Sequence, residues 1–273
     1  MRKRQVRAVI KKDITAVTSS FQTWLPMLLL PVVFSLIMPC LLIVPAYKYD
    51  ISERSILQVL EELPPGELRE TIFSFGSTNK QMIYFSVHYL FAPFLLIIPL
   101  MAASVLGSGS FAREKERKTM ESLLLAPISA PDLFRAKILA AFIPAVLLTF
   151  FSFLLYGTTV NLTAYRLFGG LIFPRPHWLI LLFWVSPALS LGAVFLNVFI
   201  SAKVKGFQEA YQLGAMTVLP LIALIAGQVT GVLLLSNTIL WFLGAGLWLL
   251  DFFLIKRAGR YLDRSKLFTT LAS

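Results

Sequence analysis

The sequence predicts an all-α membrane protein with six transmembrane helices. Of its 273 residues, 57% are hydrophobic and 14% are charged, whereas soluble domains carry about 25% charged residues. Lys, Arg, Asp and Glu are absent from five long windows, and a helix needs about 20 apolar residues to cross a bilayer. Four windows fit one span each and the fifth fits two. The windows are Phe21–Tyr47, Gln81–Ala112, Ile138–Tyr165, Pro176–Ala202 and Ala210–Leu250.

The composition excludes several other classes of protein. Disordered chains have low hydrophobicity and high charge, which is the opposite of this balance. The single cysteine, Cys40, excludes a disulfide framework. The two histidines, His88 and His177, are far apart in the sequence and form no metal-binding pair of the His-x-x-x-His type. We therefore expect no metal site and no catalytic residues.

The N-terminal segment, residues 1–20, predicts an amphipathic helix at the membrane interface. Val6, Val9 and Ile10 begin a series of apolar residues at helical spacing, with basic residues between them. A solvated basic tail is the alternative. The apolar run that follows is too long and begins too late for a cleavable signal peptide. It predicts the first span, over residues 23–46.

The segment of residues 47–83 links the first two spans and predicts a small cap. It contains six acidic and four basic residues. Apolar residues recur at helical spacing from Ile56 until Pro64, and a second short helix is expected from Glu67 to about Phe75. About 35 residues cannot bury a core unaided, so the cap is expected to pack on the spans.

A charged stretch follows the second span, which is predicted over residues 84–111. Residues 113–127 predict a short amphipathic helix, with i,i+4 charge pairs that include Glu114 with Lys118. Pro127 ends this helix. Ser129 and the residues after it form a capping signature for the third span, which is predicted over 131–157.

The remaining spans are predicted over residues 178–201, 213–235 and 238–255, followed by a tail over 256–273. Ser236-Asn237 is the expected hairpin point in the fifth window. A second weak point at Gly227–Gly231 allows the fifth span to break or re-enter there. Asp251 is the only acidic residue in the last span, and it is expected to pair with Lys256 or Arg257.

The distribution of basic residues predicts the orientation. With six spans and the N-terminus inside, 19 of the 25 Lys and Arg residues lie on the cytoplasmic side, as the positive-inside rule requires. This placement accounts for the net charge of +11 without nucleic acid. We expect a multi-pass protein of the cell membrane with both termini in the cytoplasm.

Motifs for autonomous activity are missing from the sequence. The chain has no Gly-Lys dipeptide, so it has no Walker A loop for binding nucleotide phosphates. The five apolar windows contain no Asp, Glu, Lys or Arg, which argues against ion-coupled transport because intramembrane charges mark many ion pathways. Asn197 and Gln228 are the main uncharged polar residues, and helix–helix hydrogen bonding is their expected use.

The stretch from Glu114 to Ser129 resembles the ABC-2 permease family, the membrane subunits of ATP-driven exporters. The family pattern is E-R-E-R-G-T-[LM]-E-x-L-L-x-x-P-[IV]-S, and this chain reads EKERKTMESLLLAPIS. Lys118 replaces the usual glycine, which allows continuous helix where the family has a turn. The run Phe207–Leu213 resembles the family's Q-E-A-x-Q-L sequence. Lys11-Lys12-Asp13 before the first span is a third, weaker similarity.

The resemblance implies a type V exporter-like permease whose residues 113–127 form a coupling helix. That helix would dock on an ATP-binding subunit, with two such subunits and a second permease copy or paralogue completing the assembly. ATP and Mg²⁺ would bind the partner subunit, and this chain would hold no cofactor. The implied contact residues are Glu114, Glu116, Arg117, Thr119, Glu121, Leu123 and Leu124, with a second contact at Lys203, Lys205 and Glu209.

Two other functions remain open from the sequence. One is a secondary transporter or channel that does not use ATP, and the other is a membrane scaffold without transport activity. An ATPase that co-purifies with the chain would favour the exporter. The apolar spans favour a lipophilic or lipid-linked substrate, but they do not identify it.

Overall fold

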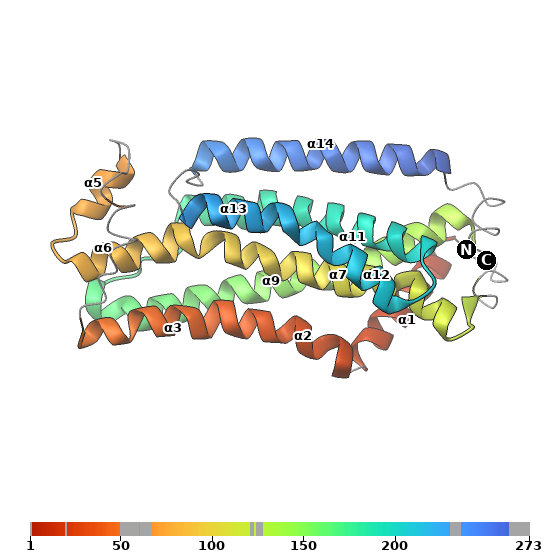
Figure 1. Cartoon of the computed structure of the whole chain (residues 1–273), viewed down its shortest axis with the longest axis horizontal. Coiled ribbons are helices and arrows are strands. Elements are labelled where there is room, and N and C mark those ends of the chain that lie inside the picture. The colour runs from red at the N-terminus through yellow and green to blue at the C-terminus, as the bar shows by residue number, and fades with distance from the viewer. Residues whose placement is uncertain are drawn as a thin grey trace.

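The computed structural model describes residues 2–19, 21–49, 60, 67–120, 123, 128–229 and 236–261. Regular structure in these residues is helical, and they contain no strand. Six helical segments are long and apolar enough to cross a membrane, which confirms the predicted all-α fold with six spans. They lie along the long axis of the molecule (Figure 1). The segments are Met27–Tyr47, Thr78–Glu116, Ala130–Phe168, Pro176–Lys203, Phe207–Gln228 and Asn237–Arg257.

The N-terminal helix α1 (Arg2–Thr18) is amphipathic, as its sequence predicts. Val9 and Val17 pack against the main hydrophobic core, whereas Arg7 and Lys11 are exposed. The helix packs mainly on the third span. The apolar face of α1 therefore packs on the bundle, and its basic face is exposed. This excludes the alternative of a solvated tail.

The first span changes its helical form three times. It consists of α2 (Phe21–Val32), a π-helical turn η1 (Val33–Ile37), α3 (Met38–Ile43) and a final 3₁₀ turn η2 (Pro45–Tyr47). Pro39 has no N–H to donate to the carbonyl four residues earlier, so regular α-helical bonding is interrupted where η1 lies. The Tyr47 hydroxyl donates to the Thr163 carbonyl and joins the end of this span to the third.

The cap beyond the first span contains α5 (Glu67–Phe73), which confirms the short helix expected from Glu67. Of the helix expected near Ile56, the structure describes only Leu60. A separate small cluster of buried apolar side chains holds the cap on the second span. Its members are Leu60, Ile72, Met82, Tyr84 and Phe85.

The second span is longer than predicted at both ends. It runs through α6 (Thr78–Phe85), a π-helical turn η3 (Ser86–Leu90) and α7 (Ala92–Glu116). Residues 113–116 are therefore the last turn of α7, and the prediction that a separate helix begins at 113 is wrong. The charged residues that follow the apolar window are good helix formers, so the helix continues through them.

Helix α7 ends in a left-handed turn at Lys118, whose φ is +54°. The Lys118 N–H donates to the Lys115 carbonyl and the Thr119 N–H to the Glu114 carbonyl, both at 3.0 Å. This is the Schellman arrangement, in which glycine is the usual residue at the left-handed position. The turn is thus retained despite the lysine, so the continuous helix that the substitution allowed does not form.

The third span is α9 (Ala130–Phe168), which extends 11 residues beyond its predicted end at 157. The predicted cap is confirmed, because the Ser129 hydroxyl oxygen accepts the Asp132 N–H at 3.3 Å. The helix stops at Gly169, which has a φ of +70°. Nothing before that glycine breaks the helix, so it continues past the apolar window.

The fourth and fifth spans are joined by a short loop. The fourth contains α10 (Pro176–Ile180), a π-helical turn η4 (Leu181–Val185) and α11 (Ser186–Lys203). The fifth contains α12 (Phe207–Ala215), a 3₁₀ turn η5 (Met216–Val218) and α13 (Leu219–Val229). It begins at Phe207 rather than 213, and its irregular turn lies just before Pro220. The predicted weak point at Gly227–Gly231 lies partly outside the described residues.

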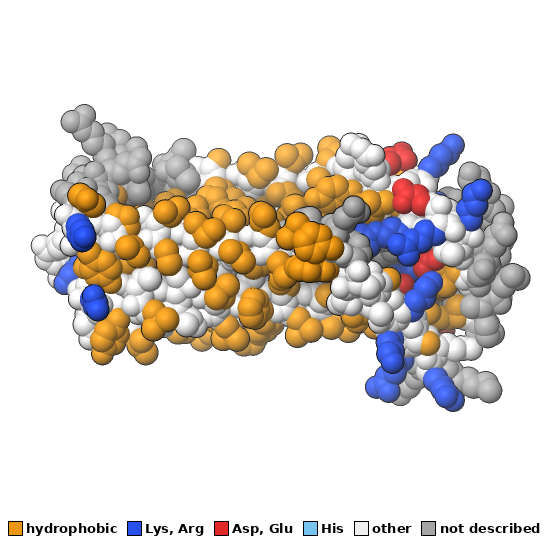
Figure 2. Space-filling view, turned by 90° about the horizontal axis from the view of Figure 1, so that it is seen from below, with side chains coloured by type: hydrophobic (Ala, Val, Ile, Leu, Met, Phe, Trp, Pro, Cys, Tyr) orange, Lys and Arg blue, Asp and Glu red, His pale blue; other side chains and the backbone are white. Residues whose placement is uncertain are grey.

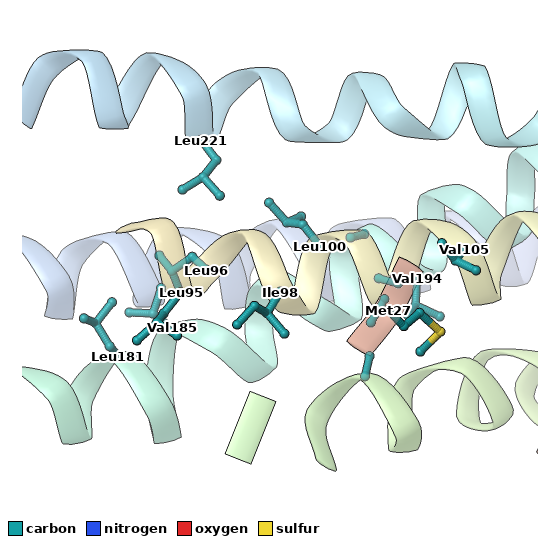
Figure 3. Packing of buried hydrophobic residues seen from close by; sticks show 14 of the residues in the cluster. Met27, Leu95, Leu96, Ile98, Leu100, Val105, Leu181, Val185, Val194 and Leu221 are labelled. Atoms are coloured by element: carbon teal, nitrogen blue, oxygen red, sulfur yellow. The ribbon is translucent and has the colours of Figure 1, made fainter. Parts of the chain in front are cut away.

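The second span is the centre of the bundle. In its most apolar window 78% of the residues are buried, compared with 17% in the fifth and sixth spans. Figure 3 shows Leu96, Ile98 and Leu100 of α7 between side chains from other helices, such as Leu181 and Leu221. The outer helices expose many large apolar side chains, as lipid-facing helices do.

The last span is α14 (Asn237–Tyr261), which packs mainly on α11. Asp251 on this helix is buried, and one oxygen of its carboxyl group has no hydrogen-bond partner. The predicted pairing of Asp251 with Lys256 or Arg257 is therefore wrong. The carboxyl group points at Gly192 of α11, since a Cβ built there would lie 2.6 Å from Oδ1.

Candidate functional site

Charged side chains gather at one end of the bundle, which we call the basic end. It comprises α1, the end of α7, the start of α9, the α11–α12 loop and the end of α14 (Figure 1). Figure 2 shows Lys, Arg, Asp and Glu side chains together there, and hydrophobic side chains along most of the remaining length. The apolar belt fits the hydrocarbon region, and the basic end fits one membrane surface.

Glu114 lies at the centre of a buried ionic network at the basic end. Its Oε1 is 2.7 Å from Lys12 Nζ of α1 and 3.5 Å from Lys137 Nζ of α9. Lys137 Nζ is also 2.9 Å from an oxygen of Asp13. Glu114 is 8% exposed and Lys137 is 1% exposed. The network therefore joins three helices, and its two buried charges, Glu114 and Lys137, depend on their partners.

The network also fixes the turn that follows α7. The Thr119 hydroxyl donates to Glu114 Oε2, and the Thr119 N–H donates to the Glu114 carbonyl. Burial raises the pKa of the Asp13 carboxyl group above its ordinary value, and the nearby Lys137 opposes that rise. Since the turn bonds to Glu114, α1 and α9 are connected through one carboxylate to the start of the segment after Lys118.

The next two residues of α7 hold the loop between the fourth and fifth spans. Lys115 Nζ donates to the carbonyls of Ala202 and Val204 at 2.8 and 2.9 Å. These acceptors lie at the end of α11, where carbonyl groups lack intrahelical partners and attract a cation. Glu116 Oε1 accepts the Phe207 N–H at 2.7 Å, which satisfies one free donor at the start of α12.

A second, uncharged contact joins the same helices further inside the bundle. The Ser108 hydroxyl lies 3.0 Å from Asn197 Oδ1 and 3.1 Å from the Ala210 carbonyl. Gly107 and Gly214 make room for Asn197, because a Cβ at either position would overlap its side chain. Asn197 therefore has the helix–helix role predicted for it. The end of α7 is thus joined to α1, α9, α11 and α12.

A family model described as ABC-2 family transporter protein matches residues 7–244. The chain belongs to the ABC-2 transporter family. The match spans most of α1, the first five spans and the start of the sixth, so it includes the contacts just described at the end of α7. Among curated proteins and among solved structures, no match was found.

Membership makes this chain a multi-pass membrane protein and a permease of an ABC-type transporter. The expected resemblance is therefore confirmed. The family also implies association with ABC ATP-binding subunits. The permease is thus a transport component of a larger assembly, and the features of the basic end can be considered as parts of that assembly.

The permease places the residues implied at the ATPase contact in different environments. Glu116, Arg117 and Thr119 form an exposed edge at the end of α7, although Glu116 also holds α12. Glu114 points into the bundle, and Leu123 is 9% exposed within the main hydrophobic core. The remaining two, Glu121 and Leu124, lie outside the described residues.

The proposed second contact lies beside this edge. Lys203 is exposed at the end of α11, and Lys205 is exposed on the loop that Lys115 holds. The Lys203 ammonium lies 4.3 Å from the centroid of the Phe199 ring. Glu209 is exposed as well, and its carboxylate accepts the Lys205 N–H at 3.2 Å. The structure therefore brings the two predicted contact regions of the permease together at the basic end.

Sequence reasoning missed several members of the site, among them Lys12, Asp13 and Lys137 as ion-pair partners and Lys115 as the residue that holds the loop after α11. Lys137 is the last charge before the apolar window of the third span, which could have marked it as a residue needing a buried acidic partner. The sequence does not reveal which acid it meets, because its partners lie 124 and 23 positions away. In the described residues, no group of three or more His, Cys, Asp or Glu side chains could bind a metal ion.

Proposed function

We propose that this permease is the membrane subunit of an ATP-driven exporter. Two permease chains form the pathway, and two separate ATPase subunits bind ATP and Mg²⁺ at the basic end. In this arrangement the basic end lies in the cytoplasm, as the positive-inside rule requires. The observation that carries the proposal is the connection of one helix end, that of α7, to α1, α9, α11 and α12.

The mechanism follows from these connections. An ATPase subunit that pushes the segment after Lys118 also displaces the end of α7, because Thr119 is bonded to Glu114. Lys12 and Lys137 carry that displacement to α1 and α9, and Lys115 carries it to α11. Packed helices move as bodies rather than deforming continuously. Closure of the nucleotide-binding subunits would thus shift the spans together and change which side of the membrane is open.

The test reverses a charge on the exposed edge. Arg117→Glu should reduce co-purification of the ATPase subunit by about tenfold, since a reversed charge at an interface rim costs on the order of 1 kcal/mol or more. ATP hydrolysis coupled to transport should fall with it. Arg117 makes no salt bridge within the described residues and is exposed, so the folded permease should be unaffected.

The matched control is Arg166→Glu. Arg166 is exposed near the end of α9, at the opposite end of the bundle. It should leave ATPase binding and hydrolysis unchanged. If the two variants behave alike, or if Arg117→Glu has no effect on either quantity, the proposed dock is wrong.

A second candidate function is favoured by Asp251. A buried carboxyl group with an unpartnered oxygen inside a span is a common feature of ion-coupled transporters. Transport by Asp251→Asn separates the two functions. ATP-driven transport should persist in this variant, whereas ion-coupled transport should be lost, with or without ATP.

A further inference from the structure

A cleft of about 140 Å³ opens at the basic end between α1, α7 and α9. On α7 it follows one stripe of the helix, from Leu106 to Arg117. At 1.5 Å per residue this stripe is about 16 Å long, so the cleft extends from the end of the helix into the level of the apolar belt. The residues that line it on α1 and α9 are Lys12, Asp13, Ala16, Val17, Lys137, Ala140 and Ala141.

The cleft is charged at its mouth and apolar in its depth. Arg113 and Arg117 lie toward the end of α7, whereas Leu106 lies two to three turns deeper. On α9, Lys137 is followed one turn deeper by Ala140 and Ala141. A lining with this gradient matches a molecule that has a charged head and an apolar body.

The cations of the cleft outnumber its acids by four to two. Lys12 is matched by Glu114 and Lys137 by Asp13. Arg113 and Arg117 form no salt bridge with any carboxylate in the part of the chain that the structure describes. The Arg113 guanidinium carbon lies 4.5 Å from the centroid of the Phe207 ring. This ring positions the cation but does not neutralise it.

Gly109 is a further sign that the Arg113 side chain lies in a fixed place. A Cβ at Gly109 would lie 2.7 Å from Arg113 Nε, so the arginine occupies the space that this glycine leaves free. Arg113 and Arg117 are one helical turn apart and line the same cleft. Two unpaired guanidinium groups that line one cleft repel each other, and a bound anion would offset that repulsion.

We propose that this cleft binds the phosphate group of an anionic phospholipid from the adjacent leaflet. Arginine suits phosphate because its planar group can donate two parallel hydrogen bonds. The lipid source follows from the position of the cleft, at the end of a span and beside the amphipathic helix α1, with apolar residues at its inner end. Arg117 also belongs to the proposed ATPase contact, but lipid binding at this site needs no partner subunit.

The test uses the purified full-length permease without an ATPase subunit. Native mass spectrometry measures retention of phosphatidylglycerol and, in parallel, of phosphatidylcholine. Phosphatidylglycerol should be retained more strongly. Arg113→Gln and Arg117→Gln should each weaken its retention by about fivefold, since one basic residue contributes about 1 kcal/mol to attraction of anionic lipid. Because Arg117 is exposed, its variant keeps the test valid even if the Arg113 variant does not fold.

Lys11→Gln is the matched control. It removes one exposed positive charge from α1, next to Lys12 but outside the cleft lining, and should leave retention unchanged. An equal loss in this control would show diffuse surface attraction and overturn the site. Equal retention of both lipids would also overturn it.

Two further measurements distinguish a bound lipid from other occupants of the cleft. Inorganic phosphate at millimolar concentration should not displace the lipid, and displacement would show a site for free phosphate instead. ATPase subunits added to the same preparation provide the second measurement. If Arg113→Gln abolishes their binding but leaves phosphatidylglycerol retention unchanged, the cleft is a protein dock and the lipid proposal is wrong.

Discussion

At the scale of single residues, neighbouring side chains in the charged stretch point in different directions and contact different helices. Glu114 faces Lys12 and Lys137, whereas Lys115 reaches the carbonyl groups at the end of α11. Adjacent positions on a helix point about 100° apart, so a run of charges can join several elements at once. Their proximity in sequence therefore does not mean that these charges share a binding surface.

The carboxylate of Glu114 should be more important for stability than that of Glu116. Glu114→Gln removes one acidic partner of the buried Lys137, which should lower the free energy of unfolding by about 3 kcal/mol. Residue 116 is exposed, and Glu116→Gln keeps an amide oxygen that can accept the Phe207 N–H, so it removes only a charge and should cost less than about 1 kcal/mol. Denaturation of both variants in the same detergent measures the difference. Equal losses would contradict the central role of Glu114.

Asp251 and Gly192 should be energetically coupled. Gly192→Ala places a methyl group 2.6 Å from Asp251 Oδ1 and should destabilise the contact between α11 and α14 by about 1–3 kcal/mol. The double variant Gly192→Ala/Asp251→Ala removes the clash and should recover most of that loss. A double-mutant cycle of thermal unfolding measures the coupling. Additive effects would show that the two residues do not meet.

At the scale of helices, the number of spans could be predicted but several boundaries could not. Apolar windows reveal how many helices cross a membrane, because each must fill the same hydrocarbon thickness. They do not reveal where a helix ends, since charged residues such as Arg113 and Glu116 are also good helix formers. The left-handed turn at Lys118 was missed for a related reason. Its hydrogen bonds depend on backbone geometry rather than on a glycine.

Replacing the lysine of this turn should stabilise the permease. Lys118→Gly relieves a left-handed conformation that costs a residue with a side chain about 1–2 kcal/mol. The greater freedom of glycine in the unfolded chain offsets part of this gain. We expect a net increase of about 1 kcal/mol in the free energy of unfolding. Lys118→Ala keeps the side-chain penalty and is the control, and an equal gain in that variant would contradict the turn.

The pairings within the candidate site could not be predicted from the sequence at all. Lys12 and Glu114 are 102 positions apart, and nothing in either local pattern identifies the other as its partner. The charged stretch itself was recognisable from its composition and its place between two spans. The sequence therefore identified the stretch but not its geometry. It implied that Glu114 lies on an outer surface, whereas in the structure Glu114 points into the bundle.

At the scale of the whole molecule, the bundle is organised around the second span. Most of this helix is buried, and its end is connected to four other helices. The fifth and sixth spans lie at the periphery and expose apolar side chains to their surroundings. A force applied beside α7 at the basic end would therefore reach most of the permease through direct contacts, which fits a subunit driven by a separate ATPase.

Site-specific photo-cross-linking in the assembled transporter tests this claim most directly. A photoreactive residue placed at Arg117, on the exposed edge of the basic end, should form a covalent product with the ATPase subunit. The same residue at Arg166, at the opposite end of the bundle, should form none. A product from Arg166, or no product from Arg117 in an assembly that still hydrolyses ATP, would contradict the account.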